Sequence, residues 1–239
     1  MVIGIVGGMG SYATLDLFER YLSIFNAEKE WDRPRIIIDN RCTMPSRVRA
    51  LLYDEKREQL VNELTDSIKR LVDAGCDYVV LACNTSHVFL EEIFKKAPET
   101  QPYVLNIIEL CAEHIVSSGL NKDDTLALIA TEGTIQSKIY QETFKKYGLD
   151  VVSPSETVFK ELRFFIEAVK TNSLDNQITT EFCDFLRKQP GNNLILGCTE
   201  FPVIFNKLKK PKSIQSLNVF DPLEATLLFL HKVFTKRIK

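Results

Sequence analysis

The sequence has no excess of charge of either sign. Its 239 residues include 30 Lys and Arg against 32 Asp and Glu, which gives a formal net charge of −2. Without a basic excess nothing attracts the phosphates of a nucleic acid, so no nucleic-acid partner is expected. One short basic cluster, interrupted by Leu208 and Pro211, is expected to be a solvated loop: Lys207, Lys209, Lys210 and Lys212.

Long apolar runs and paired cysteine motifs are also absent. No stretch approaches the roughly 18 residues needed to span a bilayer, so no membrane association is expected. The start, Met1-Val2-Ile3-Gly4, lacks a basic region and a cleavage pattern and predicts a strand rather than a signal peptide. Six cysteines lie far apart without a CxxC pair. We therefore expect reduced thiols in a cytoplasmic protein.

Common metal and cofactor motifs are missing as well. The sequence contains no cluster of His, Cys and Asp at zinc spacing and no Walker-type phosphate loop. The segment Gly7-Gly8-Met9-Gly10, counted from Gly4, reads Gly-x-x-Gly-Gly-x-Gly. This departs from the dinucleotide fingerprint G-x-G-x-x-G, so a nicotinamide cofactor is not expected.

What the sequence does contain is an alternation of short β-rich apolar runs with segments of helical period. Strands are expected at 2–6, 35–39, 78–82, 103–106, 125–129, 150–152, 194–196 and 217–220. Two amphipathic helices are expected between them, one burying Leu60, Leu64, Ile68 and Leu71, the other Leu15, Phe18, Leu22 and Phe25. This alternation predicts an α/β fold with mostly parallel sheets covered by helices on both faces.

A weak internal repeat divides the chain into two related halves. Residues 2–11 resemble 126–134, each a strand followed by a loop of small residues and a helix. Further along, Leu81-Ala82-Cys83-Asn84-Thr85 in the first half corresponds to Leu196-Gly197-Cys198-Thr199-Glu200 in the second. Each half therefore carries one cysteine at an equivalent place.

These two cysteines suit acid–base chemistry on opposite faces of one carbon. Each follows a strand, where open α/β sheets bind ligands, and precedes a helix, whose N-terminus favours a thiolate. If the halves face each other, Cys83 and Cys198 point into a cleft from opposite sides, which is a two-base racemase or epimerase geometry. A buried cysteine can instead act simply as a small hydrophobic residue. We interpret the other four cysteines in this way, one of which (Cys42) is expected on a loop: Cys42, Cys76, Cys111 and Cys183.

Three motifs in order resemble the aspartate/glutamate racemase superfamily: Gly7-Gly8-Met9-Gly10-Ser11-Tyr12-Ala13-Thr14, Ala82-Cys83-Asn84-Thr85-Ser86-His87 and Leu196-Gly197-Cys198-Thr199-Glu200. The Cys-Thr-Glu ending is similar to the aspartate racemase branch. Ser11 departs from it, because that branch often has Pro there. The resemblance implies two similar α/β domains related by pseudo-twofold symmetry, with the active site between them. It also implies a homodimer without pyridoxal phosphate or metal, with domains at 1–104 plus 216–239 and at 105–215.

The resemblance assigns Cys83 and Cys198 as the catalytic thiols. Arg47 matches its carboxylate-binding arginine, Lys160 matches a second cation, and Asp221-Pro222 matches a motif with a structural role. The full set of expected substrate-binding residues is Gly8, Met9, Arg47, Asn84, Thr85, Thr131, Gly133, Thr134, Lys160, Thr199 and Glu200.

Several roles stay open at this point. Thr85 and Thr199 are equally suited to capping a helix. Arg41 and Arg49 could share the role of Arg47, and His87 could serve the site or be structural.

The resulting prediction is a cofactor-independent amino-acid racemase that interconverts L- and D-aspartate. Alternatives are a glutamate or broad-specificity racemase, a hydantoin racemase or a maleate isomerase. A binding protein that kept the cleft without catalysis is a further alternative, because a fold alone does not determine a function.

Overall fold

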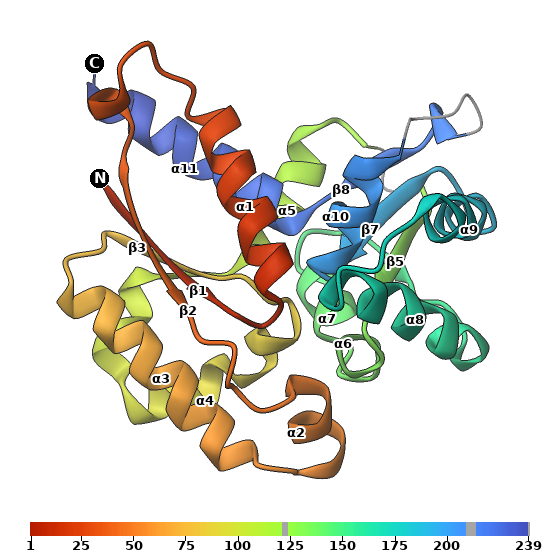
Figure 1. The fold of residues 1–239 in the computed structure, drawn as a ribbon, viewed down its shortest axis with the longest axis horizontal. Helices are drawn as coiled ribbons and strands as arrows, with labels where there is room; N and C mark the ends of the chain where they lie inside the picture. The colour runs from red at the N-terminus through yellow and green to blue at the C-terminus, as the bar shows by residue number, and fades with distance from the viewer. Residues whose placement is uncertain (121–123, 209–213, 239) are drawn as a thin grey trace.

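A computed structural model describes residues 1–120, 124–208 and 214–238. Within these ranges the chain forms two four-stranded parallel sheets, ordered β2-β1-β3-β4 and β6-β5-β7-β8 (Figure 1). The strands are β1 (Val2–Gly7), β2 (Arg35–Asn40), β3 (Tyr78–Leu81), β4 (Val104–Leu105), β5 (Leu126–Ala130), β6 (Val151–Val152), β7 (Asn193–Gly197) and β8 (Asn218–Phe220). All eight predicted strands are confirmed, with ends that differ by at most two residues.

Helices cover both faces of the first sheet. They are α1 (Ser11–Ile24), α2 (Arg47–Tyr53), α3 (Arg57–Asp73), α4 (Leu90–Lys96) and α5 (Ile107–Ser117), with 3₁₀ turns η1 (Glu30–Asp32), η2 (Thr85–Phe89) and η3 (Pro98–Tyr103). Side chains alternate between the faces of a strand. In β1, Ile3 and Ile5 accordingly join the apolar cluster around α1 and α5, whereas Val6 joins the cluster with α3.

The second sheet repeats this plan. Its helices are α6 (Glu132–Gln136), α7 (Ile139–Lys145), α8 (Phe159–Lys170), α9 (Asn176–Arg187) and α10 (Glu200–Lys207), with the 3₁₀ turn η4 (Glu156–Val158). All residues of β5 and β7 are buried, as expected for central strands of a covered parallel sheet. The two strand orders are equivalent, with β1 corresponding to β5 and β3 to β7.

One of the two predicted helix faces is confirmed in full and the other in part. The α3 face is confirmed, because Leu60, Leu64, Ile68 and Leu71 are all buried. In α1, however, the buried residues are Ala13, Thr14, Leu17 and Tyr21, and Leu15 is 51% exposed. This helix is covered by α10 and α11 (Pro222–Ile238) as well as by the sheet. The predicted α1 face is therefore right for Phe25, which is buried, and for Phe18 and Leu22, which pack half-buried against the core, and wrong for Leu15.

The C-terminal segment connects the halves. Strand β8 pairs with β7 in the second sheet, and α11 then packs against α5 and α1, on the side of the first sheet (Figure 1). At the junction Asp221 accepts a hydrogen bond from Leu223 N (2.9 Å) and forms an ion pair with Arg20 of α1. The domain boundaries stay a prediction, and most of the predicted basic loop at 207–212 lies outside the described residues.

None of the helices in the described parts of the chain is both long and apolar enough to cross a bilayer.

Candidate active site

Four central strands end at one shared cavity. Met9 follows β1, Cys83 follows β3, Thr131 follows β5 and Cys198 follows β7. In each sheet the order reverses between the two central strands, and such a switch point opens a crevice at the carboxyl ends of the strands. The fold therefore brings the switch points of both halves together, with one cysteine from each.

The cavity has a volume of about 50 Å³ and contains nine of the thirteen predicted site residues. Its lining residues are Met9, Ser46, Arg47, Val48, Cys83, Asn84, Thr85, Thr131, Ile166, Lys170, Cys198, Thr199 and Glu200. A second, wider cavity of about 360 Å³ adjoins it and shares Ser46, Val48, Thr131, Ile166 and Lys170. The small polar chamber thus continues into a broader vestibule between α2 and α8.

Cys83 lies on a loop that a buried histidine holds in place. Nδ1 of His87 is 3.0 Å from the carbonyl oxygen of Cys83, and Nε2 accepts a hydrogen bond from Ile107 N (3.4 Å). Burial is the main cause that lowers the pKa of His87, to about 4. The imidazole is therefore neutral at physiological pH, with its proton on Nδ1, and its role here is structural.

Asn84 presents its amide nitrogen without a protein partner. Its Oδ1 accepts a hydrogen bond of 2.6 Å from the hydroxyl of Tyr140, which is fully buried in α7. This bond orients the amide. Among the residues that the structure describes, Nδ2 of Asn84 has no hydrogen-bond partner. A buried donor without a partner is costly, so Nδ2 is a candidate contact for a ligand oxygen.

Cys198 comes directly after β7 and lies against a buried carboxylate. Its thiol donates to Oε2 of Glu200 at 3.0 Å. Both residues are buried, at 6% and 3% exposure. Burial is the main cause that raises the pKa of Cys198 well above its usual value, and the negative charge of Glu200 adds to the effect. The thiol form of Cys198 is therefore favoured.

Three threonine hydroxyls join the halves beside the cysteines. Thr85 Oγ1 lies 3.0 Å from Thr131 Oγ1 and 2.9 Å from Thr134 Oγ1, and these two are 3.0 Å apart. Thr131 also caps α6 by accepting from Thr134 N (3.2 Å). Thr134 itself is outside the cavity lining and supports the two threonines that line it. Neither Thr85 nor Thr199 caps a helix with its side chain in the described structure.

Arg47, the first residue of α2, is held over the loop after β1. Its Nη2 donates to Met9 O, and Nη1 donates to Pro45 O at 3.2 Å. Its Nε is buried and has no partner within the described ranges. The guanidinium is therefore anchored at one end, and one donor remains available near the cavity.

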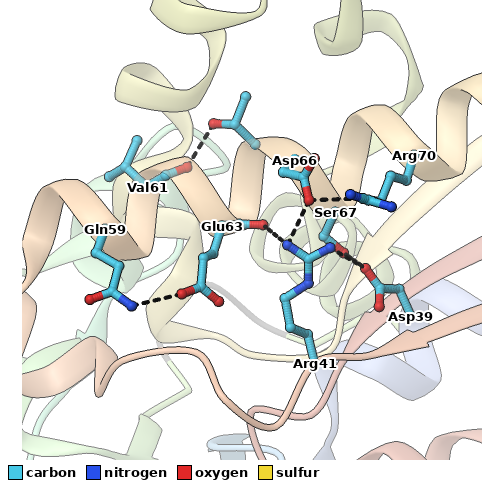
Figure 2. Close-up of polar contacts among 9 residues, drawn as sticks. Asp39, Arg41, Gln59, Val61, Glu63, Asp66, Ser67 and Arg70 are labelled. Carbon is cyan, nitrogen blue, oxygen red and sulfur yellow. Dashed lines mark hydrogen bonds and ion pairs between the residues drawn. The ribbon is translucent and has the colours of Figure 1, made fainter.

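The two flanking arginines are engaged elsewhere. Arg41 pairs with Asp39 (3.1 Å) and Asp66 (2.8 Å) and donates to Glu63 O, as Figure 2 shows. Arg49 is exposed and pairs with Glu55. Of these three arginines, Arg47 is the one that lines the small cavity.

Lys160 lies at the exposed start of α8 and is not part of the cavity lining, which Lys170 joins from the other end of the same helix. Lys170 is ten residues, nearly three turns, beyond Lys160. Burial alone would lower the pKa of Lys170, but the charges of Glu200 and Glu167 raise it above its usual value. Lys170 was not among the predicted site residues. The available signal was its place at the C-terminal end of an amphipathic helix that also supplies Ile166.

The two remaining predicted residues, Gly8 and Gly133, lie outside the cavity lining. Gly8 has φ +80°, and a Cβ there would lie 2.4 Å from the backbone of Arg41, so glycine permits the close packing of the loop that presents Met9. Gly133 faces Val48 of α2, where a Cβ would be in ordinary van der Waals contact at 3.4 Å from the Val48 Cα, so the packing there does not require glycine.

Within the described part of the chain, no group of three His, Cys, Asp or Glu side chains is placed to hold a metal ion. All six cysteines are free, and Cys42 is exposed. The polar groups that converge on the cavity are thus hydroxyls, amides, one carboxylate and two cations around two thiols. Such a set can bind a small zwitterion and move a proton.

Comparison with known proteins gives a consistent picture. A profile of the Asp/Glu/Hydantoin racemase family matches residues 6–229. Aspartate racemase from Picrophilus torridus has 28% identity and a TM-score of 0.77, over 97% of this chain and 94% of that structure. Glutamate racemase from Aquifex pyrophilus is 30% identical over 164 residues, which are 67% of this chain.

RacX of Bacillus subtilis, a broad-specificity amino-acid racemase, is 28% identical over 155 residues. The matched segments cover 60% of the length of the Aquifex pyrophilus enzyme and 63% of RacX, which is less than two thirds of each relative.

Proposed function

The chain belongs to the Asp/Glu/Hydantoin racemase family, and from this we propose that it is a cofactor-independent racemase of an acidic amino acid, with aspartate as its substrate. The observation that carries the proposal is that Cys83 and Cys198, from equivalent strand ends, line one cavity together with two cations. A homodimeric assembly and a cytoplasmic location stay predictions.

The reaction is an exchange of one proton across the α-carbon. The thiolate of one cysteine takes the α-proton, which breaks the C–H bond and leaves the electron pair on carbon. The opposing thiol gives its proton to the other face and becomes a thiolate. Thiols suit both steps because their pKa lies near neutrality and depends strongly on their neighbours. The reverse reaction exchanges the two roles.

The polar groups of the cavity fit the charges of the substrate. The free Nδ2 of Asn84 and the hydroxyls of Thr85, Thr131 and Thr199 are donors for the α-carboxylate, whose negative charge grows as the proton leaves. Oε1 of Glu200 also lacks a partner among the described residues and is an acceptor for the ammonium. Arg47 and Lys170 are the cations for the side-chain carboxylate.

A second candidate substrate is glutamate. The wider cavity of about 360 Å³ that adjoins the site leaves room for a longer acidic side chain, and a glutamate racemase is among the relatives. Both candidates predict the same two-thiol chemistry, so the choice between them rests on the substrate test.

The test is α-proton exchange and racemisation in D₂O, followed by NMR and chiral chromatography, with both enantiomers of aspartate and glutamate. We expect the wild type to exchange and racemise aspartate faster than glutamate. Cys83→Ala and Cys198→Ala should each lose racemisation and keep exchange with one enantiomer only, opposite in the two variants. Cys42→Ala, on an exposed loop, is the matched control and should behave as wild type.

Absence of exchange with all four substrates in the reduced enzyme would refute the racemase proposal. Faster reaction with glutamate would keep the mechanism and change the substrate.

A further inference from the structure

The two cysteines have different neighbours. Residue 85, two positions after Cys83, is a threonine, whereas the corresponding position after Cys198 is Glu200. Oε2 of Glu200 accepts from the Cys198 thiol at 3.0 Å and from the Thr199 hydroxyl at 3.3 Å. Among the described hydrogen bonds, the Cys83 side chain has no equivalent carboxylate partner.

The space for this carboxylate comes from Gly10. A Cβ at Gly10 would lie 2.6 Å from Oε1 of Glu200, so a side chain there would displace the carboxylate from its present position. The backbone at Gly10 has φ −146° and ψ 131°, which any residue adopts. The backbone conformation at Gly10 therefore does not require glycine. What glycine provides here is space for the Glu200 carboxylate.

The other titratable groups near this pair come from four elements. Cys83 lies at the end of β3, Tyr140 on α7 and Lys170 on α8, and all three interact electrostatically with Cys198. Burial raises the pKa of Tyr140 well above its usual value, so it is a neutral phenol. Arg47 of α2 lines the same cavity and is, with Lys170, the second cation there, and the positive charge of Lys170 partly offsets that of Glu200.

We propose that Glu200 is a positioning residue that holds Cys198 in its protonated, hydrogen-donating form, so that the two thiols begin each turnover in opposite protonation states. A two-base racemase needs one thiolate and one thiol at the start. Two equivalent thiols would reach that state only for part of their population. With a carboxylate beside Cys198 alone, the resting enzyme has Cys198 as the acid and Cys83 as the base, which is the form that begins one direction of the reaction. The opposite direction begins from the less populated form with these roles exchanged.

The same contact has a consequence after proton donation. When the Cys198 proton moves to the α-carbon, the electron pair of the S–H bond stays on sulfur. The resulting thiolate then faces the Glu200 carboxylate at hydrogen-bond distance in a buried site. Like charges at this distance repel, so the Cys198 thiolate is short-lived and takes up a proton before the Cys83 thiol loses one.

The role of Glu200 deepens the proposed two-thiol reaction, but its test does not require racemase activity. The rates of alkylation by iodoacetamide at Cys83 and at Cys198 are measured separately by peptide mass spectrometry, from pH 6 to about 10. Because only thiolates react, the pH dependence of each rate reports the ionisation of that thiol. In the wild type we expect Cys198 to become reactive at more alkaline pH than Cys83. Glu200→Gln, which keeps the shape and removes the charge, should speed alkylation of Cys198 at pH 8 by about tenfold or more and leave Cys83 unchanged.

The control for loss of a nearby carboxylate is Glu132→Gln in the vestibule, which does not contact either thiol and should leave both rates unchanged. In an active enzyme, Glu200→Gln should also move the alkaline limb of the kcat/KM profile to lower pH and leave the acid limb in place. A purely structural role would lower activity without moving this limb.

Equal or slower alkylation of Cys198 in Glu200→Gln would overturn the proposal. If this variant does not fold, the wild type decides alone, because simultaneous onset of reactivity at both cysteines would overturn it too. Faster alkylation of Cys198 in a protein that racemises nothing would uphold the role of Glu200 and refute the racemase proposal instead.

Discussion

Nδ1 of His87 lies 3.0 Å from the carbonyl oxygen of Cys83, and through this bond a fully buried imidazole positions one of the two thiols. The other ring nitrogen accepts from Ile107 N, so the ring also joins this loop to the first turn of α5. The bond from Ile107 N requires the neutral ring, because a protonated Nε2 cannot accept.

This burial predicts a loss of stability in mild acid. The folded pKa of His87, about 4, is below the ordinary 6.5, so between these values only the unfolded chain binds the proton. The stabilisation is complete above about pH 6.5 and falls as the pH decreases toward 4, by on the order of 3 kcal/mol. Urea unfolding at pH 7.5 and 5 measures it. His87→Asn should flatten this dependence, whereas His114→Asn, at an exposed position, should not.

Gly10→Ala should impair activity through Glu200. The new methyl group displaces the carboxylate, and we expect kcat/KM to fall on the order of 10- to 100-fold. In a Glu200→Asp background the shorter side chain leaves room, so adding Gly10→Ala should cost no more than about twofold. Steady-state kinetics on the four proteins of this cycle measures the coupling. An equal cost of Gly10→Ala in both backgrounds would contradict the contact.

Thr85→Val should destabilise the protein by about 1–3 kcal/mol, because it leaves the hydroxyls of Thr131 and Thr134 with fewer partners in a buried site. Thr85→Ser keeps the hydroxyl and should recover most of that loss. Denaturant unfolding at constant pH provides the comparison. If the Thr85→Val and Thr85→Ser variants are equally stable, the hydrogen bonds among the three threonine hydroxyls do not stabilise the contact between the halves.

Arg47→Lys should lower kcat/KM for aspartate by about 10- to 100-fold. The change removes the planar donor fork that a carboxylate prefers, and a hydrogen bond to a charged group contributes about 1.5–3 kcal/mol. Arg49→Lys is the matched control, since Arg49 pairs with Glu55 on the surface, and it should keep wild-type kinetics. The proposed role of Arg47 fails if the two variants have the same kinetics.

The sheet architecture was predictable because strand signals are local. Buried parallel strands such as β5 and β7 are short, continuous apolar runs, and the matched cysteine motifs showed that the halves repeat. Periodicity predicted the face of α1 only in part. Phe18, Leu22 and Phe25 do pack against the core, but the burial of this helix also depends on α10 and α11, which are distant in sequence, and Leu15 is left exposed.

Site residues that directly follow a strand were predictable from the sequence, and site residues on helices were less so. Cys83, Thr131 and Cys198 follow strands directly, so the fold alone brings them to the cavity. A cation on a helix carries no such signal. Lys160 and Lys170 lie on the same helix, and which one reaches the cavity depends on how α8 packs against the second sheet. Likewise, the roles of Arg41 and Arg47 differ because of acidic partners on β2 and α3.

The equivalent strand orders of the two halves bear on why both halves are in one polypeptide. A pair of identical half-length chains, assembled around a twofold axis, would present two cysteines with identical neighbours. Any acidic residue placed beside one thiol would then appear beside the other. Covalent fusion removes that constraint, since each copy can diverge, and here position 85 is Thr while its counterpart at 200 is Glu. Thus a single chain can give two thiols different neighbours, which a symmetric pair of half-length chains cannot do.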